Sequence, residues 1–213
     1  MDLTVAITGA TSGIGRAVAE AFVDEGAFVA VSGRDGDAVD RTVAALNGAG
    51  DDPDAEADGD ADAGDDSPAD DAERGTAWGD RVDVRDEFDL ERFFERAARE
   101  AGPIDVVFAN AGVFHGAPGE RPTTEVTYAD YDDTMRTNAR GVFATVTEAV
   151  PHLADDARVL VPSGAVAAEA KPGVGAHAVS HAAAAAGARG LAPARAAPVG
   201  ALLPAPRRTH PPP

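Results

Sequence analysis

The sequence predicts one α/β domain built around a parallel sheet that is covered by helices on both faces. A chain of 213 residues is long enough to bury one sizeable core. Short apolar runs alternate along it with segments whose apolar residues recur at helical spacing. The runs are apolar throughout, which is typical of strands that are buried on both faces. Together these patterns predict a doubly wound parallel sheet.

The strands and helices are expected in regular alternation. Residues 3–8 form an apolar, β-branched run, and helical spacing of apolar residues follows the next glycines. Residues 28–31 predict a second strand, and Asp37 is placed to cap the helix that carries Val39, Val43 and Leu46 on one face. The other expected elements are a third strand ending at residues 82–84, a helix around 88–100, a strand over 104–109, a long helix from about 129 to 152 and a fifth strand over 158–161.

Two segments depart from this alternation. Residues 48–77 carry 12 acidic residues among Gly, Ala and Pro, a composition that does not bury a core. We expect a disordered, solvated insertion there, with an interaction segment as the alternative. Residues 191–213 hold seven of the 15 prolines. We therefore expect a single domain over residues 1–190 and an irregular, proline-rich tail with no further strand, which would leave the sheet without its last strands.

Charge and composition exclude several classes of partner. The formal net charge is −19, which disfavours nucleic acid and is typical of proteins adapted to high salt. The absence of cysteine excludes disulfides, thiolate catalysis and cysteine-ligated metals. No apolar run reaches the roughly 20 residues that span a bilayer, and no leader pattern precedes the first strand. We expect a cytoplasmic protein with no membrane partner.

A glycine-rich string directly after the first strand carries the strongest functional signal. It sits between a strand and a helix, the context in which such a turn holds the pyrophosphate of a dinucleotide. Gly9 permits a tight turn, Gly13 lets the backbone approach a phosphate, and Gly15 allows close helix packing. The alternative is a plain turn between strand and helix. The string predicts a Rossmann-type domain whose cofactor contacts include Thr8, Gly9, Thr11, Ser12, Gly13, Ile14 and Gly15.

This string, TGATSGIG, resembles the glycine motif of the short-chain dehydrogenase/reductase family, and three further strings agree with that family in order and spacing. Asp83-Val84 resembles the Asp-Val pair that contacts the adenine, and Asn110-Ala111-Gly112 resembles the Asn-Ala-Gly at the end of the fourth strand. Asn138 falls where the family places a catalytic asparagine on a helix. The resemblance covers about residues 3–190 and implies a nicotinamide cofactor.

The residues after the second strand bear on the choice of cofactor. At the position of Gly33 no acid is present to bind the ribose 2′-hydroxyl of NAD, and Arg34 can pair with the 2′-phosphate of NADP. The alternative is that Arg34 faces solvent and that Asp35 serves NAD. We expect NADP(H) to be preferred, with NAD(H) possible.

The catalytic positions that the resemblance implies are only partly kept. Ser163 matches the serine that polarises the substrate carbonyl, but 14 positions later His177 and His181 replace the family's Tyr-x-x-x-Lys. His177 can exchange protons near neutral pH, whereas His181 is no permanent cation. Their spacing also fits a metal, but the sequence offers no further ligand, and no metal site is expected. His115 is expected in an exposed loop rather than in the substrate cleft.

These observations predict an NADP(H)-dependent oxidoreductase that acts on a small carbonyl or alcohol, with Ser163, His177, His181 and Asn138 at the catalytic positions and with weak turnover or none. The alternatives are a dinucleotide-binding protein without catalysis, and a truncated family member without function. By analogy with the family, pairing through the long helices predicts a homodimer or homotetramer.

Overall fold

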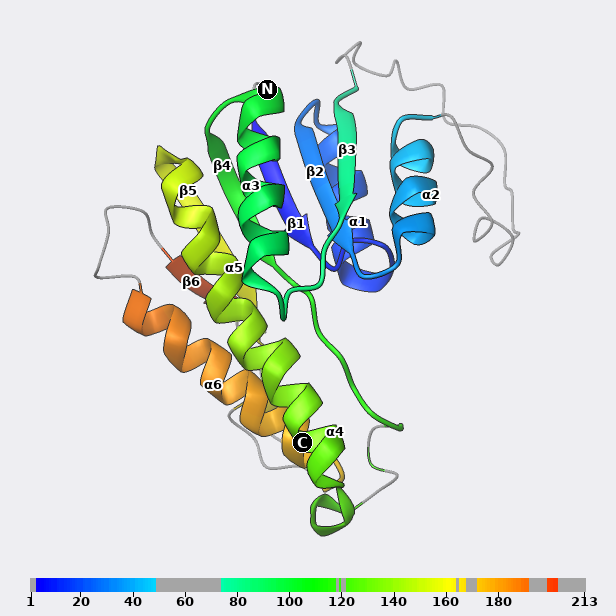
Figure 1. The fold of residues 1–213 in the computed structure, drawn as a ribbon, viewed down its shortest axis with the longest axis vertical. Coiled ribbons are helices and arrows are strands. Elements are labelled where there is room, and N and C mark those ends of the chain that lie inside the picture. The colour runs from blue at the N-terminus through cyan, green and yellow to red at the C-terminus, as the bar shows by residue number, and fades with distance from the viewer. Residues whose placement is uncertain are drawn as a thin grey trace, which may run out of the picture.

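The computed structural model describes residues 3–48, 74–117, 119, 122–163, 165–167, 172–191 and 199–202. Six parallel strands form one sheet in the order β3-β2-β1-β4-β5-β6 (Figure 1). From β1 the chain adds β2 and then β3 toward one edge of the sheet. It then crosses back to place β4 on the other side of β1, and adds β5 and β6 toward the opposite edge. This reversal is the switch point at which doubly wound sheets bind ligands. The predicted Rossmann-type fold is confirmed.

The first half of the sheet is built from three strands and two helices. β1 (Thr4–Thr8) is buried along its whole length and is followed by α1 (Gly13–Asp24). β2 (Phe28–Gly33) pairs with β1 on one side and with β3 (Thr76–Arg81) on the other, and α2 (Gly36–Leu46) connects toward β3. The apolar runs read from the sequence therefore lie in the centre of the sheet.

The second half places a long helical segment beside the sheet. The elements in chain order are α3 (Glu87–Ala101), β4 (Ile104–Ala109), η1 (Thr123–Glu125), α4 (Tyr128–Thr134), a π-helical turn η2 (Met135–Arg140), α5 (Gly141–Ala149), η3 (Val150–His152), β5 (Leu153–Pro162), η4 (Ala165–Ala167), α6 (Gly175–Leu191) and β6 (Val199–Leu202). The expected long helix is thus present, but it is interrupted by the π-helical turn in its middle.

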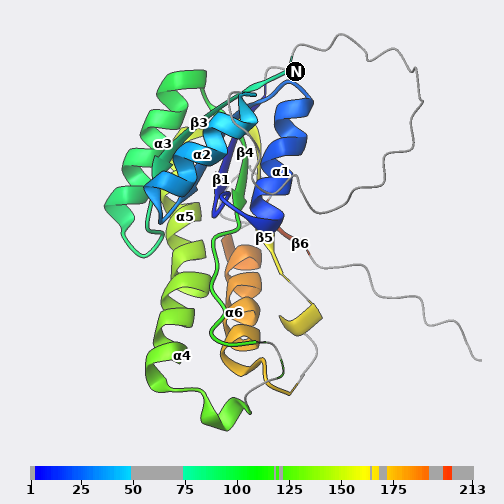
Figure 2. The same ribbon diagram turned by 90° about the vertical axis from the view of Figure 1, so that its right-hand side faces the viewer.

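Two apolar clusters cover the two faces of the sheet. Residues of α1 and α2, among them Val23 and Leu46, pack on side chains such as Ile7. On the opposite face, Phe93 and Phe94 of α3 pack with residues of α5 and the sheet. Figure 2 shows α1 and α3 on opposite sides of β1 and β4. Among the described helices, none is long and apolar enough to cross a membrane.

Four details differ from the sequence expectations. β3 ends at Arg81 rather than at residues 82–84, and residues 76 and 77 belong to this strand rather than to the acidic insertion, whose residues 49–73 lie outside the described part. Asp35, not Asp37, caps α2, because the Asp35 carboxylate accepts a hydrogen bond from the Ala38 N–H at 3.3 Å.

The fourth difference concerns the tail. Residues 199–202 form β6, which pairs parallel with β5, so the expectation of a tail without a strand is wrong. The short run Val-Gly-Ala-Leu between prolines is sufficient for an edge strand because such a strand pairs on one side only. The sheet therefore continues beyond β5.

Candidate functional site

The turn between β1 and α1 has the conformation that its glycines permit. Gly9 and Gly13 have φ values of +68° and +56°, which side chains rarely adopt. A Cβ added to Gly13 would meet no atom within 4 Å, so open space lies beside its backbone. A Cβ on Gly15 would lie 2.3 Å from the Gly9 carbonyl oxygen, and the start of α1 can pack on the turn only with glycine there.

The end of β4 supports this turn from the neighbouring strand. The Asn110 side-chain amide donates to the Gly9 carbonyl at 2.8 Å, and the Ala111 N–H donates to the Thr8 hydroxyl at 3.3 Å. A Cβ on Gly9 would lie 2.7 Å from the Ala111 Cα. The Asn-Ala-Gly string and the glycine string, about 100 residues apart in sequence, thus form one unit because β1 and β4 are adjacent.

A cavity of about 300 Å³ opens in front of this unit. Its wall contains most of the residues predicted to contact a cofactor, namely Gly9, Thr11, Ser12, Arg34, Val84, Asn110, Ala111 and Gly112. Among the described residues, Thr8, Gly13, Ile14, Gly15 and Asp83 are not part of that wall. The wall also contains Gly33, Val82, Val113 and Thr137, which the sequence analysis did not predict as cofactor contacts.

Gly33 and Arg34 form one end of the cavity. A Cβ at Gly33 would lie 2.7 Å from the Thr11 methyl group, so the absence of an acid there is also a packing requirement. The Arg34 side chain is exposed, and among the ion pairs of the described residues none involves it, although its charge helps to lower the pKa of Asp83. The neighbouring Asp35 carboxylate is already engaged as the cap of α2. This end of the cavity therefore presents a cation and no free acid from Asp35.

Asp83 is held by an arginine rather than turned into the cavity. Arg85 donates to both Asp83 oxygens at 2.6–3.0 Å, and this pairing holds the pKa of the Asp83 carboxyl below its usual value. Arg85 also donates to Asp133 of α4 at 2.7 Å. The Asp-Val string thus contributes Val84 to the cavity wall, while the Asp83 side chain anchors the β3 end to the long helical segment.

Two of the catalytic positions, His177 and His181, lie on α6, and His177 faces the π-helical turn in the middle of the long helical segment. The two histidines lie one turn apart on α6, and their ring centroids are 4.2 Å apart. The Phe114 ring contacts His177 edge-on, with 5.0 Å between the ring centroids. Ser163 directly follows β5 and is 4% exposed. Its hydroxyl and the His181 Nδ1 are buried and have no hydrogen-bond partner among the described residues. Buried polar atoms without partners mark places where a ligand can supply the missing bond.

Burial disfavours the charged form of both histidines. It lowers the pKa of His177 below its usual value, against the opposing effect of the Val113 carbonyl. It also lowers the pKa of His181, and the neighbouring His177 lowers it further, while the Pro162 carbonyl opposes the shift. Neither side chain is therefore a permanent cation. His181 therefore differs from the lysine that the family resemblance implies at this position, because a lysine carries a permanent positive charge.

Asn138 connects the end of β4 to α6. It lies in the π-helical turn, where its side chain accepts from the Val113 N–H at 2.8 Å and donates to the Val113 carbonyl at 2.9 Å. The same amide donates to the Ser180 hydroxyl at 3.2 Å and lies 3.5 Å from the His177 Nδ1. Asn138 thereby fixes the distance between the loop after β4 and the helix that carries both histidines.

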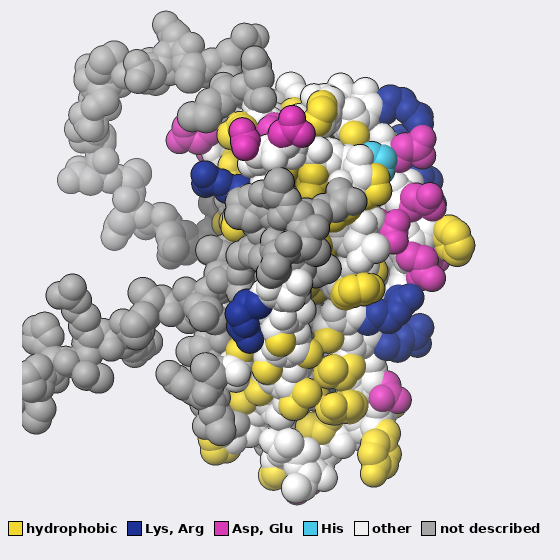
Figure 3. Space-filling model, turned by 90° about the vertical axis from the view of Figure 1, so that its left-hand side faces the viewer, with side chains coloured by type: hydrophobic (Ala, Val, Ile, Leu, Met, Phe, Trp, Pro, Cys, Tyr) yellow, Lys and Arg dark blue, Asp and Glu magenta, His cyan; other side chains and the backbone are white. Residues whose placement is uncertain are grey.

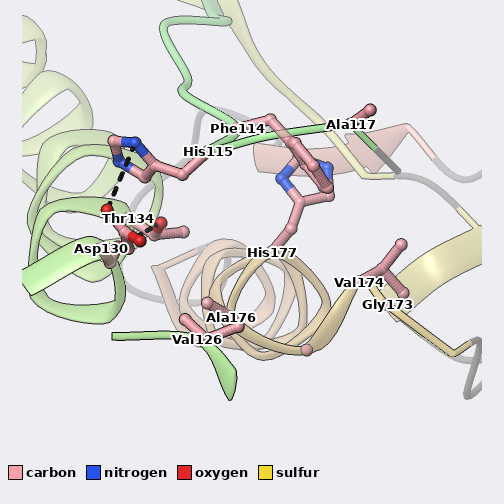
Figure 4. Close-up of a pocket in the computed structure, with 11 residues that line it drawn as sticks. Phe114, His115, Ala117, Val126, Asp130, Thr134, Gly173, Val174, Ala176 and His177 are labelled. Atoms are coloured by element: carbon pink, nitrogen blue, oxygen red, sulfur yellow. Dashed lines mark hydrogen bonds and ion pairs between the residues drawn. The ribbon is translucent and has the colours of Figure 1, made fainter. Parts of the chain in front are cut away.

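A small second cavity lies beside His177 (Figure 4). Its volume is about 30 Å³, against about 300 Å³ for the cavity at the glycine turn. His115 lies in the loop after β4 and is exposed, as expected. It lines this cavity, and its Nε2 lies 3.0 Å from the Asp133 carboxylate. The acids on α4 hold this ring, a contact between distant segments that the loop sequence does not reveal. Across the described residues, no group of three His, Asp or Glu side chains could hold a metal.

Comparisons with known proteins agree with this geometry. The family described as short chain dehydrogenase matches residues 3–63, and the one described as Enoyl-(Acyl carrier protein) reductase matches residues 69–200. The oxidoreductase asL5 of Sarocladium schorii is 32% identical over 151 residues, 71% of this chain and 48% of that protein. The chain spans about half the length, or less, of the curated relatives it matches.

Solved structures show the same fold. A dehydrogenase/reductase from Sinorhizobium meliloti is 28% identical, with a TM-score of 0.72 over 93% of this chain and 70% of that one. A short-chain dehydrogenase from Burkholderia cenocepacia, solved in complex with NADP, is 23% identical, with a TM-score of 0.74 over 94% of this chain and 73% of that one. The fold and the glycine turn define a dinucleotide-binding α/β domain. Within that class, the chain belongs to the short-chain dehydrogenase/reductase family.

Proposed function

We propose that this chain binds NADP(H) and acts as an oxidoreductase on a small carbonyl or alcohol, with slow turnover. The observation that carries the proposal is the 300 Å³ cavity, which has the glycine turn along one wall and Arg34 at one end. The NADP complex of the Burkholderia cenocepacia protein, which has the same fold, agrees with this choice of cofactor.

The residues of the cavity fit a dinucleotide. The open space beside Gly13 and the N–H groups at the start of α1 suit a pyrophosphate, since a helix N-terminus favours anions. The exposed guanidinium of Arg34 suits a 2′-phosphate, because arginine recognises phosphate through its planar fork of donors. Asp35 is a weaker candidate for the ribose of NAD because its carboxylate caps α2.

Ser163 and His177 would provide the groups that act on substrate. The unpartnered Ser163 hydroxyl can donate to a substrate oxygen, and the neutral His177 ring can accept a proton from an alcohol. Asn138 positions His177 through the contacts of its side chain with Val113 and Ser180. The nicotinamide ring, when bound, takes up or releases the hydride. Neutral histidines favour alcohol oxidation over carbonyl reduction at neutral pH.

The second candidate is a dinucleotide-binding protein without catalysis. The lack of a permanent cation at His181, whose pKa burial lowers, favours it. A panel of aldehydes, ketones and alcohols assayed with NADP(H) and NAD(H) separates the two candidates. Cofactor-dependent turnover that is lost in His177→Gln supports the enzyme. Saturable cofactor binding without any turnover supports the second candidate.

Cofactor titration tests the binding proposal. We expect saturable quenching or enhancement of NADPH fluorescence, with a dissociation constant below that of NADH. In Arg34→Ala, the loss of a charge-assisted contact should raise the dissociation constant of NADPH by about tenfold or more. The dissociation constant of NADH should stay within about twofold of the wild-type value. Asp37→Ala, in the first turn of α2 and outside the cavity wall, serves as the control. Equal affinities for the two cofactors would contradict the role of Arg34.

We propose further that the chain forms a homodimer or homotetramer through α5 and α6. Phe143 and Val179 on these helices are 58% and 46% exposed, and hydrophobic side chains gather over the lower half of the face that carries α6 (Figure 3). Sedimentation velocity should show a dimer or larger species, and Phe143→Glu with Val179→Glu should give monomers. A monomeric wild-type chain at micromolar concentration would contradict the proposal.

A further inference from the structure

Ser180, which directly precedes His181 on α6, is fully buried, and its hydroxyl makes two hydrogen bonds. The hydroxyl donates to the His177 carbonyl at 2.8 Å, and it accepts from the Asn138 side-chain amide at 3.2 Å. A serine hydroxyl has one hydrogen, and the donation to the carbonyl uses it. Ser180 can therefore only accept from Asn138, and it occupies one of the two N–H groups of that amide.

The orientation of the Asn138 amide follows from the backbone of Val113. The Asn138 side-chain oxygen accepts from the Val113 N–H at 2.8 Å, and the side-chain nitrogen donates to the Val113 carbonyl at 2.9 Å. A reversed amide would place two donors together at one contact and two acceptors together at the other. The nitrogen is therefore the atom that meets α6. Its two hydrogens go to the Val113 carbonyl and to Ser180, and none is left for a third acceptor.

The Nδ1 atom of His177 lies 3.5 Å from the same amide nitrogen and would be that third acceptor. This distance is long for a hydrogen bond, and the Ser180 oxygen at 3.2 Å is the nearer acceptor. Burial lowers the pKa of His177, and the Val113 carbonyl opposes this shift, as a carbonyl does when a ring N–H donates to it. The carbonyl has a second lone pair for this bond. Nδ1 is therefore better satisfied as a donor than as an acceptor.

We infer that Ser180 sets the tautomer of His177: it occupies the second N–H of Asn138 and so leaves the ring proton on Nδ1 and the lone pair on Nε2. The use of that lone pair rests on the proposed oxidoreductase function. In alcohol oxidation the O–H bond of the substrate breaks and its proton passes to Nε2, while the hydride goes to the nicotinamide. His177 lines the small cavity in Figure 4, and in the other tautomer its Nε2 could not accept a proton. Ser180 is thus a positioning residue that acts through Asn138.

The tautomer can be measured without a substrate. In protein that contains ¹⁵N-labelled histidine, two-bond ¹H–¹⁵N correlation spectra at about pH 8 distinguish a protonated from an unprotonated ring nitrogen. The His177 signals are those that His177→Gln removes. We expect the wild-type proton on Nδ1. In Ser180→Ala the released Asn138 N–H can donate to Nδ1, so the ratio of the Nε2–H form to the Nδ1–H form should rise by about tenfold, the effect of one hydrogen bond.

Two further variants control for the change at a buried hydroxyl. Ser180→Thr keeps the hydroxyl and should keep the wild-type tautomer. Thr145→Val removes a buried hydroxyl that donates to the Gly141 carbonyl within α5 at 2.7 Å. This variant loses the same kind of bond within a helix, but the bond does not involve Asn138. The His177 proton should therefore stay on Nδ1.

Rates of alcohol oxidation connect the tautomer to the reaction. In Ser180→Ala, kcat/KM should fall in proportion to the share of the Nδ1–H form that remains, while the dissociation constant of NADPH stays within about twofold of the wild-type value. A wild-type His177 with its proton on Nε2, or a Ser180→Ala spectrum equal to that of the wild type, would overturn the inference. A changed tautomer with an unchanged oxidation rate would also overturn it, because Nε2 would then not be the base. If the wild type has the expected tautomer but no turnover, the assignment of the tautomer stands and the proposed oxidoreductase function fails.

Discussion

The protonation of His177 should control the direction of the reaction. Burial lowers the pKa of His177 below the usual value of a histidine. A histidine with a pKa of about 6.5 is about 90% protonated at pH 5.5, about one quarter at pH 7 and about 3% at pH 8. Carbonyl reduction needs the protonated ring as acid. Its kcat/KM should therefore fall at least about 30-fold from pH 5.5 to pH 8, and a lower pKa makes the fall steeper.

Alcohol oxidation should respond in the opposite direction. It needs the neutral ring as base, so its kcat/KM should rise with pH and reach a plateau at or below about pH 7.5. Steady-state rates followed by NADPH absorbance across this range measure both limbs. His177→Gln should remove the pH dependence of kcat/KM in both directions and lower the rates by about 10²–10⁴-fold. His152→Gln, which replaces a histidine on η3, should keep this pH dependence.

Two results would refute this reasoning. A reduction limb with a midpoint above pH 6.5 would mean that the ring is stabilised as a cation, against the effect of burial. A limb that persists in His177→Gln would mean that another group transfers the proton.

Three further predictions concern the scaffold. Gly15→Ala places a methyl group against the Gly9 carbonyl, so urea unfolding should show a loss of about 1–3 kcal/mol and NADPH binding should disappear. Asn138→Ala leaves the Val113 N–H and carbonyl without their side-chain partner, and the same measurement should show a loss of about 1–3 kcal/mol. Folding lowers the pKa values of His177 and His181, so the unfolded chain binds protons more readily than the folded protein. The free energy of unfolding should therefore be highest above about pH 6.5 and fall as the pH drops below it. Each histidine should contribute a fall of at most about 1.4 kcal/mol per pH unit. Urea midpoints of the His177→Gln, His181→Gln double variant should show a smaller fall, and an equal fall would contradict the assignment.

Patterns of consecutive residues predicted the fold well. The buried strand β4 has the bounds 104–109 that its apolar run predicted, and the order of strands and helices followed from alternating periodicities. The glycine string predicted a tight turn because the need for Gly9 and Gly15 arises within the string and its neighbouring strand. Features of this kind depend on local sequence and on sheet topology, both of which a sequence expresses directly.

Contacts between distant segments were harder to predict. His115 lies in an exposed loop as expected, but its contact with Asp133, 18 residues later, was not predicted. The cap of α2 was assigned to Asp37 instead of Asp35 because both acids stand near the start of the helix. The π-helical turn η2, which interrupts the expected long helix, was also missed, because the sequence gives no clear signal for it. The catalytic assignments of Ser163, His177 and His181 stay predictions.

The central claim is that the chain binds NADP(H) at a site whose neutral histidines limit the chemistry. The most direct measurement determines the NADPH dissociation constant and the turnover rate on the same sample, for the wild type and for a variant with His177→Tyr and His181→Lys. We predict saturable binding within about fivefold in both proteins and at least about 100-fold faster turnover in the variant, in line with the contribution of a positioned proton donor. Absence of NADPH binding, or a wild-type turnover equal to that of the variant, would contradict the claim.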